Sequence, residues 1–427
     1  MDDKAGHGMV DAASESAALP AIEVPAVWTL GGLGAGLLVG LAPAALPMLA
    51  GPVKALASLL DPLGALWLKG LQMTILPLVA AVLVIGITQT MRAASAGAMA
   101  RRTLSWIMAV YLIGAAMAAL VVPALLDWWP IPGGVSGALK APASTGPVPG
   151  LGDFLLSILP ANVFTAAAND ALLPCVSFFV LLALAIGKLP PAQQAPLTNL
   201  FNALGAAMTV MIGWVLALAP LGVFALGLSL ATRAGASAIG VLAHYITLIS
   251  GIGGVVLVAA YVLVITLGRV PLARFARAML PAETVAIATQ SSLASLPTML
   301  GACRELGVRQ VTADFVLSLS VALFRGTGPA MNLAVAIYMA KLTGVTLTPW
   351  LLVSGVIVAA LTEFGSPSLP GAISLFGAVG PVALAMGVPI GPLALLVAVE
   401  MLPDLMRTVG NVAMDVAVAV LVDRAES

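Results

Sequence analysis

The sequence contains few charged residues for its length. Only 8% of its 427 residues are charged, whereas a soluble globular protein carries about 25%. So few charges cannot cover the surface of a soluble protein of this size, but a lipid bilayer accepts an apolar exterior. Hydrophobic residues make up 61% of the chain, and the mean hydropathy is +1.11. Apolar stretches long enough to cross a membrane, about 20 residues each, recur along the whole sequence. The composition therefore predicts an integral membrane protein.

Histidine and cysteine are also scarce. His7 and His244 are far apart, and Cys175 and Cys303 have neither metal-ligand nor disulfide-framework spacing, so no metal site is expected. The formal net charge is zero, which gives no basic field for nucleic acid. Residues 1–25 hold five acidic residues and a single lysine, with no apolar core. They are predicted to be a disordered cytoplasmic tail and not a cleaved signal.

Hydropathy divides the chain into apolar spans and interrupted segments. Six spans are predicted near 27–47, 57–91, 103–126, 153–187, 195–231 and 239–268. Segments 271–305 and 350–387 are interrupted midway, at 289–292 and 365–371, and their halves are too short to cross a bilayer. Such breaks survive only where protein or water covers the backbone, so we expect two re-entrant hairpins. Two further continuous spans are predicted at 308–342 and 390–422.

The placement of lysine and arginine predicts the orientation of the spans. With the N-terminus inside, eleven basic residues lie on the cytoplasmic side and four on the other. The cytoplasmic ones are Lys4, Arg92, Arg101, Arg102, Lys188, Arg269, Arg274, Arg277, Arg304, Arg309 and Arg424. Both termini are therefore expected in the cytoplasm, and 127–152 is expected to be an extracytoplasmic loop.

The last span carries a stripe of polar residues. Glu400, Asp404, Arg407, Thr408, Asn411 and Asp415 fall within an arc of about 100° of a helix, and the rest of that helix is apolar. Each charged residue at the bilayer centre costs at least ~2.5 kcal/mol, so four facing lipid would cost on the order of 10 kcal/mol. The stripe must face a hydrated cavity lined by protein. Its three acids and one base leave an excess negative charge that favours bound cations over a purely structural network.

Arg325 is a second charge expected at membrane depth. It precedes Gly326-Thr327-Gly328-Pro329, a sequence that should unwind the helix and free backbone carbonyls. Interrupted helices at the bilayer midplane are a common way for secondary transporters to build binding sites.

Several segments together resemble the dicarboxylate/amino acid:cation symporter family, the glutamate-transporter homologues. The resemblance runs from about 27 to 424 and is most specific in Asp404-x-x-Arg407-Thr408-x-x-Asn411-x-x-x-Asp415, which matches the family's eighth-helix motif at every spacing. Residues 67–79, 160–174, 219–226 and 290–297 resemble its second, fourth and fifth helices and the serine-rich tip of its first hairpin.

This resemblance implies the fold and the assembly. The family is all-α, with eight transmembrane helices and two re-entrant hairpins in an inverted-repeat, elevator-type arrangement. It implies a homotrimer in the cell inner (plasma) membrane, whose scaffold is 26–102 and 153–238. The moving transport domain would be 103–126 and 239–424. No cofactor and no enzymatic activity are implied.

The resemblance also implies roles for the polar residues. Arg407 would hold the side-chain carboxylate of an anionic substrate as a bidentate fork, and Asp404 would pair with its amino group. Asn411 and Thr408 would hold the main-chain groups, with Ser292, Thr327 and Ala372 completing the site. Retention of Asp404 beside Arg407 favours an acidic amino acid over a plain dicarboxylate, which has no ammonium group.

The sequence departs from the family at its sodium ligands. The family's Asn-Met-Asp-Gly-Thr appears here as Leu323-Phe324-Arg325-Gly326-Thr327. A Thr-Ser pair appears as Gly114-Ala115, and a hairpin arginine appears as Gln290. Hard cations need several oxygen ligands, and of the sodium ligands Asp415 and Asn411 remain.

These departures suggest that Arg325 is a tethered cation standing in for bound sodium. Arginine cannot lose its proton at working pH, so a buried carboxyl group, Glu400 or Glu363, would carry a coupled proton. The coupling cation, H+ or Na+, stays open at this point. A sodium-coupled dicarboxylate symporter and a substrate-gated anion channel or sensor are the alternatives. An intramembrane aspartyl protease is excluded because Asp404 and Asp415 share one helix.

Overall fold

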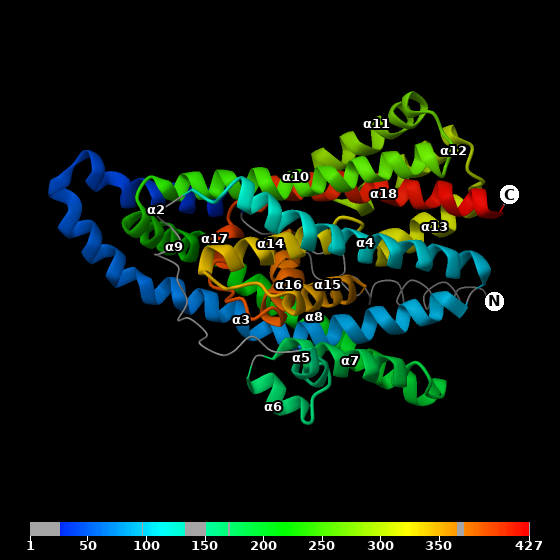
Figure 1. The fold of residues 1–427 in the computed structure, drawn as a ribbon, viewed down its shortest axis with the longest axis horizontal. Coiled ribbons are helices and arrows are strands. Elements are labelled where there is room, and N and C mark those ends of the chain that lie inside the picture. The colour runs from blue at the N-terminus through cyan, green and yellow to red at the C-terminus, as the bar shows by residue number, and fades with distance from the viewer. Residues whose placement is uncertain (1–25, 96, 133–150, 170, 365–370, 427) are drawn as a thin grey trace, which may run out of the picture.

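The computed structural model describes residues 26–95, 97–132, 151–169, 171–364 and 371–426 (Figure 1). All regular structure within these residues is helical, which confirms the predicted all-α class. The first helices are α2 (Ala26–Ala45), the 3-10 helix η1 (Pro47–Leu49), α3 (Ala50–Ser95), α4 (Ala98–Trp128), α5 (Leu151–Ser157), α6 (Val163–Ala168), α7 (Leu172–Ile186), α8 (Pro191–Ala217) and α9 (Ala219–Ala234). They are followed by α10 (Ser237–Thr266), α11 (Leu272–Thr289), α12 (Ser292–Leu306), α13 (Gln310–Leu323), α14 (Gly328–Thr343), α15 (Pro349–Glu363), α16 (Gly371–Ala385), α17 (Leu393–Leu396) and α18 (Met401–Glu426).

Six helical stretches in the described part of the chain are long and apolar enough to cross a membrane. They are Val27–Ala45, Pro47–Ser95, Ala98–Trp128, Pro191–Ala217, Ser237–Thr266 and Met401–Glu426. At 1.5 Å per residue the 46 residues of α3 extend about 69 Å, more than twice the ~30 Å hydrocarbon thickness. Helix α3 must therefore be strongly tilted or project beyond the bilayer. These stretches make the chain a multi-pass membrane protein.

The first group of packed helices is formed by α2, α3, α8 and α9, in which α2 packs along α9, and α3 packs along both α8 and α9. Helix α2 approaches α9 closely because Gly32, Gly36 and Gly40 lie one turn apart on its contact face. A Cβ atom at Gly36 would collide with the backbone of Phe224. Small residues at this spacing let membrane helices pack backbone to backbone.

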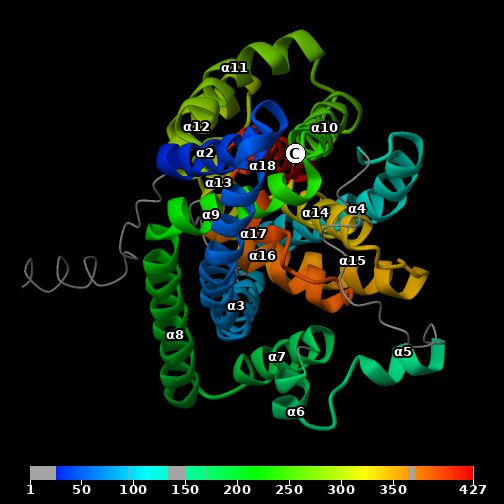
Figure 2. The same ribbon diagram turned by 90° about the vertical axis from the view of Figure 1, so that its left-hand side faces the viewer.

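The second group surrounds α18, which packs along α10 and also contacts α11, α12 and α13. Helix α14 packs against α4, α15 and α16. Figure 1 shows α10 and α18 running side by side, with α11 and α12 beyond them. Figure 2, turned by 90°, shows α5, α6 and α7 on the far side of α3 from this group. The buried polar residues of α18 are therefore enclosed by other helices.

Four of the predicted spans are divided. The span 195–231 is α8 and α9, which are separated at Leu218. The span 153–187 is α5, α6 and α7, because Pro160 and Asn162 interrupt it and the Asn162 side chain caps α6 by accepting from the backbone N–H groups of Phe164 and Thr165. The span 308–342 is broken between α13 and α14, so it is not continuous, and the break lies at the Gly-Pro sequence that was expected to unwind it. The predicted continuous helix 390–422 was wrong: α17 ends at Leu396, and tight turns precede α18.

The two predicted hairpins are described to different extents. Helices α11 and α12 pack on each other and meet at Gln290, which adopts the left-handed conformation (φ 51°) and ends α11. Ser291 then caps α12 by accepting from the Ala294 N–H group. Helices α15 and α16 also pack together, but the tip between them, 365–370, lies outside the described residues.

Candidate functional site

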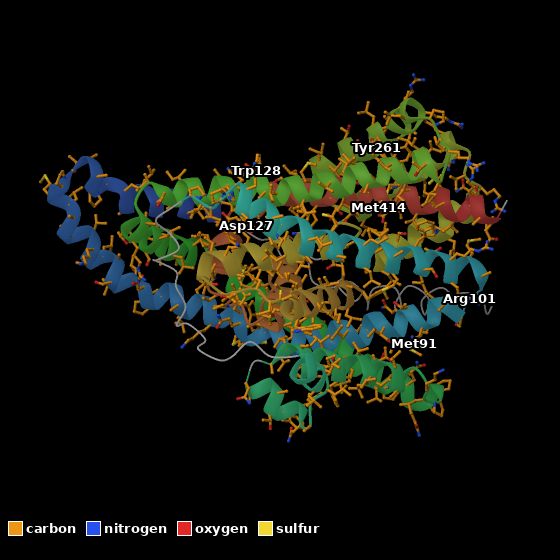
Figure 3. All side chains as sticks on the ribbon, viewed as in Figure 1. Met91, Arg101, Asp127, Trp128, Tyr261 and Met414 are labelled. Atoms are coloured by element: carbon orange, nitrogen blue, oxygen red, sulfur yellow. The ribbon has the colours of Figure 1, made fainter. Side chains whose placement is uncertain are left out.

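The polar residues of the predicted stripe are buried inside the protein. Asp404, Arg407, Thr408, Asn411 and Asp415 lie on α18 and are at most 8% exposed. Met414, which Figure 3 labels, lies on the same helix between Asn411 and Asp415. Glu400 lies in the turn before α18 and not in the helix, yet it is only 2% exposed. The prediction that the stripe faces protein and not lipid is confirmed.

Arg407 is the centre of a hydrogen-bonded cluster. Its Nη2 atom donates to Glu400 Oε1 at 2.8 Å, and its Nε lies 3.3 Å from Asp404 Oδ1. Its Nη1 donates to Asn332 Oδ1 at 2.9 Å. The other carboxylate oxygen of Glu400 accepts from the Tyr245 hydroxyl at 2.7 Å. Every nitrogen of the guanidinium therefore has a partner, and an incoming carboxylate must use its remaining N–H groups or displace one of these partners.

A third carboxyl group, that of Glu363, joins this cluster through Asn332. The Nδ2 atom of Asn332 donates to Glu363 Oε2 at 2.9 Å, and both residues are 1% exposed. Glu363 is the last residue of α15, and Asn332 lies in α14, five residues beyond the helix break. Glu363 was predicted from the sequence as a site residue, whereas Asn332 and Tyr245 were not. The signal for Asn332 was a lone amide in an apolar helix whose first thirteen residues are all buried.

The break between α13 and α14 is held by side chains from two other helices. The Tyr111 hydroxyl on α4 donates to Leu323 O and accepts from the Arg325 N–H group, each at 3.0 Å. Thr327 donates its N–H group to Asn411 Oδ1 at 2.9 Å, and its hydroxyl lies 2.8 Å from the same oxygen. Because Oδ1 of Asn411 faces Thr327, its amide nitrogen remains to donate to another group.

Two carboxyl groups lie within electrostatic reach of Arg325. The Arg325 charge acts on Glu363 and on Asp404. Asp415 differs from both, because it is fully buried and neither of its carboxyl oxygens has a hydrogen-bond partner among the described residues. The region thus combines two cationic side chains with four acidic ones. The two cationic residues are Arg325 and Arg407, and the four acidic ones are Glu363, Glu400, Asp404 and Asp415.

The remaining predicted site residues are placed less completely. Ser292 begins α12, which packs on α18, and it is half-buried. The Thr408 hydroxyl donates to Asp404 O of its own helix at 3.0 Å. The side chain of Ala372 lies outside the described residues. The structure therefore joins Asp404, Arg407 and Glu400 directly, Glu363 through Asn332, and Thr327 with Asn411, into one buried region.

Comparisons of the sequence with known proteins identify the family of the chain. The profile of the sodium:dicarboxylate symporter family matches residues 26–425. The proton/sodium-glutamate symport protein of Bacillus subtilis (strain 168) is 24% identical over 387 residues, which cover 87% of each chain. The proton/glutamate-aspartate symporter of Escherichia coli (strain K12) is 26% identical over 378 residues, which cover 86% of this chain and 84% of the relative.

A third relative is named for a different substrate, L-cystine. The L-cystine uptake protein TcyP of Bacillus anthracis is 28% identical over 273 residues, which cover 61% of this chain and 58% of the relative. The profile match extends over nearly the whole chain and includes both the hairpin segments and the polar stripe of α18. The protein therefore belongs to the sodium:dicarboxylate symporter family, a family of secondary transporters and not of enzymes.

Proposed function

We propose that the protein transports an acidic amino acid, aspartate or glutamate, or a related dicarboxylate, by a sodium-independent, proton-coupled elevator mechanism. The observation that carries this proposal is the pairing of Arg407 with Asp404 inside a buried cluster. The guanidinium of Arg407 suits the side-chain carboxylate of the substrate, and the carboxylate of Asp404 suits its ammonium group. The names of the Bacillus subtilis and Escherichia coli relatives, a glutamate and a glutamate-aspartate symporter, support the same substrate class.

The roles of the site residues follow from their donors and acceptors. Arg407 binds the side-chain carboxylate, and Asp404 accepts from the amino group. Asn411 and Thr408 hold the main-chain groups, and the free amide nitrogen of Asn411 suits a carboxylate. Thr327 fixes the orientation of that amide. Ser292 and Ala372 close the site from the two hairpins.

The coupling proposal rests on Arg325. It stands where the family has a sodium-binding aspartate, and its charge acts on Asp404 and Glu363 in place of a bound cation. Because arginine keeps its proton, the transported proton must be carried by a carboxyl group. Glu363 and Glu400 are buried, hydrogen-bonded and connected to Arg407, so each is placed to respond to substrate.

The proposed architecture has eight transmembrane helices and two re-entrant hairpins, with both termini in the cytoplasm of a cell whose inner membrane holds the protein. The scaffold is 26–102 and 153–238, and the transport domain is 103–126 and 239–424. Packing of α2, α3, α8 and α9 on one another supports the first, and packing of α10, α14 and α18 with the hairpins supports the second. We further propose a homotrimer assembled through the scaffold.

A sodium-coupled symporter is the second candidate, and Asp415 favours it. A fully buried carboxyl group without a hydrogen-bond partner among the described residues is suited to a bound cation. Within this candidate, Asp415 and nearby backbone carbonyls of the helix break would hold one sodium ion.

Uptake of labelled L-aspartate into proteoliposomes tests the proposed function. We expect saturable accumulation that excess unlabelled L-glutamate blocks, together with exchange against internal aspartate, which a channel does not perform. The Arg407→Ala variant should show no accumulation. If the unaltered protein neither accumulates nor exchanges aspartate, the substrate assignment is wrong.

A further inference from the structure

Asn332 connects the proposed substrate-binding arginine to the end of the second hairpin. Its amide oxygen accepts from Arg407 Nη1, and its amide nitrogen donates to Glu363 Oε2, each at 2.9 Å. Both groups of the amide are thus used, one for each charged neighbour. A buried amide in an apolar helix is costly unless its hydrogen bonds are made, and here both are made to charged groups.

The approach of Glu363 to α14 depends on a glycine one turn before Asn332. A Cβ atom at Gly328 would collide with the Glu363 carboxyl group. The absence of a side chain at Gly328 therefore lets the carboxyl group reach both the start of α14 and the Asn332 amide. Gly328, Asn332 and Glu363 together form one buried contact between α14 and α15.

We propose that Asn332 is the positioning residue that links substrate binding at Arg407 to the protonation of Glu363. This inference rests on the proposed function and deepens it, because it selects Glu363 over Glu400 as the carrier of the coupled proton. It also explains why an amide is buried between an arginine and a glutamate.

The linkage follows from hydrogen bonding. Without substrate, Asn332 is held between Arg407 and Glu363, and its N–H group stabilises the Glu363 carboxylate. A substrate carboxylate that accepts the Arg407 Nη1 hydrogen bond in place of Asn332 removes one partner of Asn332. It also adds negative charge near Glu363. Both changes disfavour the carboxylate. Glu363 then binds one proton from water in the site, and it releases that proton when the substrate leaves and Asn332 re-forms its two bonds.

The surroundings of Glu363 contain two cationic side chains and one phenol. Arg325 in the helix break and Arg407 on α18 both act on its charge, and the Tyr111 hydroxyl on α4 lies within the reach of the same charge. Helices α3, α7 and α16 also pack against α15. Helices α7 and α16 contain no charged residue, and the charged residues of α3, which are Lys54, Asp61, Lys69 and Arg92, are not among the groups that act on Glu363. Among these neighbours Arg407 is the proposed substrate ligand, and Asn332 is its direct connection to Glu363.

The test measures proton uptake during L-aspartate binding by the purified full-length protein. Calorimetry in buffers of different ionisation enthalpy gives the number of protons taken up per substrate, and titrations over about four pH units give the pH dependence of Kd. For the unaltered protein we expect uptake of about one proton and a Kd that tightens by up to about tenfold for each unit of falling pH. The Glu363→Gln variant should bind with no such proton uptake.

Asn332→Ala is the deciding variant. We expect it to bind aspartate with the same loss of proton uptake and a flattened pH dependence, and the double variant should add nothing to Glu363→Gln alone. If the Asn332→Ala variant does not fold, the Asn332→Leu variant is measured in its place, because leucine fills the space of the amide without polar atoms. Thr362→Val is the matched control, because Thr362 is buried and precedes Glu363 directly in the sequence. Among the described residues its hydroxyl bonds Val358 O of its own helix and not the Asn332 cluster. That control should keep the full proton uptake.

Two results overturn the proposal, and they differ from a failure of the proposed function. If Asn332→Ala and Asn332→Leu keep the proton uptake that Glu363→Gln loses, Glu363 carries the proton but Asn332 does not transmit substrate binding. If Glu363→Gln keeps the full uptake, the carrier is another group. Absence of aspartate binding by the unaltered protein overturns the substrate assignment and this inference together.

Discussion

Arg407 Nη2 lies 2.8 Å from Glu400 Oε1, and the two side chains are only 7% and 2% exposed. A buried ion pair of this kind is weak evidence for stability, because desolvation of both charges offsets their attraction. Removing one partner alone is costly, about 3–5 kcal/mol, because the other charge is left buried and unpaired. The pair ties Arg407, the proposed substrate-binding residue, to an acid that lies outside α18, in the turn before it.

Replacing Arg407 by lysine is expected to weaken acidic-substrate binding. Lysine keeps the charge but lacks the planar fork that binds a carboxylate with two parallel hydrogen bonds. Losing a charge-assisted hydrogen bond costs roughly 1.5–3 kcal/mol, so the Kd for L-aspartate should rise roughly 10- to 100-fold. Isothermal titration at one pH measures this change. An unchanged Kd would show that Arg407 does not contact the substrate.

Replacing Arg325 by alanine is expected to abolish transport or to create a new dependence on an added cation. The change removes the positive charge that acts on Asp404 and Glu363, so an added cation would be needed to compensate their negative charge. Uptake should be measured with sodium, potassium and choline as the only monovalent cation. Arg233→Ala is the control, since Arg233 makes an exposed salt bridge with Asp61 away from the site. Full, cation-independent activity of Arg325→Ala would contradict the tethered-cation hypothesis.

Replacing Tyr111 by phenylalanine is expected to disturb the break between α13 and α14. The variant loses the hydroxyl that bonds both Leu323 O and the Arg325 N–H group. Two buried bonds at about 1 kcal/mol each predict a loss of up to ~2 kcal/mol in stability and a transport rate lower by about tenfold. Tyr338→Phe is the control, because that hydroxyl bonds Val241 O and lies 3.1 Å from His244 Nδ1, both on α10 and outside the break. Equal effects of the two variants would mean that the Tyr111 bonds have no special role.

Gly36→Ala and Gly34→Ala form a matched pair in α2. A Cβ atom at Gly36 would collide with the Phe224 backbone, whereas nothing lies within 4 Å of one at Gly34. Overpacking typically costs 1–3 kcal/mol, so we expect a lower melting temperature for Gly36→Ala alone. The Kd for aspartate should not change in either variant, because α2 lies outside the site. Equal melting temperatures would contradict the close α2–α9 packing.

The sequence predicted the features of the site that depend on local patterning. Helical periodicity placed the stripe of α18 on one buried face, and Gly326 to Pro329 located the break, because both follow from spacing along one segment. Asn332 and Tyr245 were missed because their partners, Glu363 and Glu400, are 31 and 155 residues away in the sequence. Only tertiary packing brings such residues together.

The divided helices have a similar explanation. Hydropathy averages over a window, so it counted 153–187 and 390–422 as single spans although each contains breaks set by single residues. Asn162 caps α6 with its side chain, and tight turns between Leu396 and Met401 place Glu400 before α18. Neither feature changes the mean hydropathy of its segment.

The decisive measurement is uptake of labelled L-aspartate into proteoliposomes, with an inward sodium gradient compared with a sodium-free inward proton gradient. We expect accumulation that follows the proton gradient and is the same with or without sodium, because Arg325 replaces the bound cation and a buried glutamate carries the proton. Accumulation that requires sodium and ignores the proton gradient would contradict it, and would assign a sodium site to Asp415 and the carbonyl groups of the helix break.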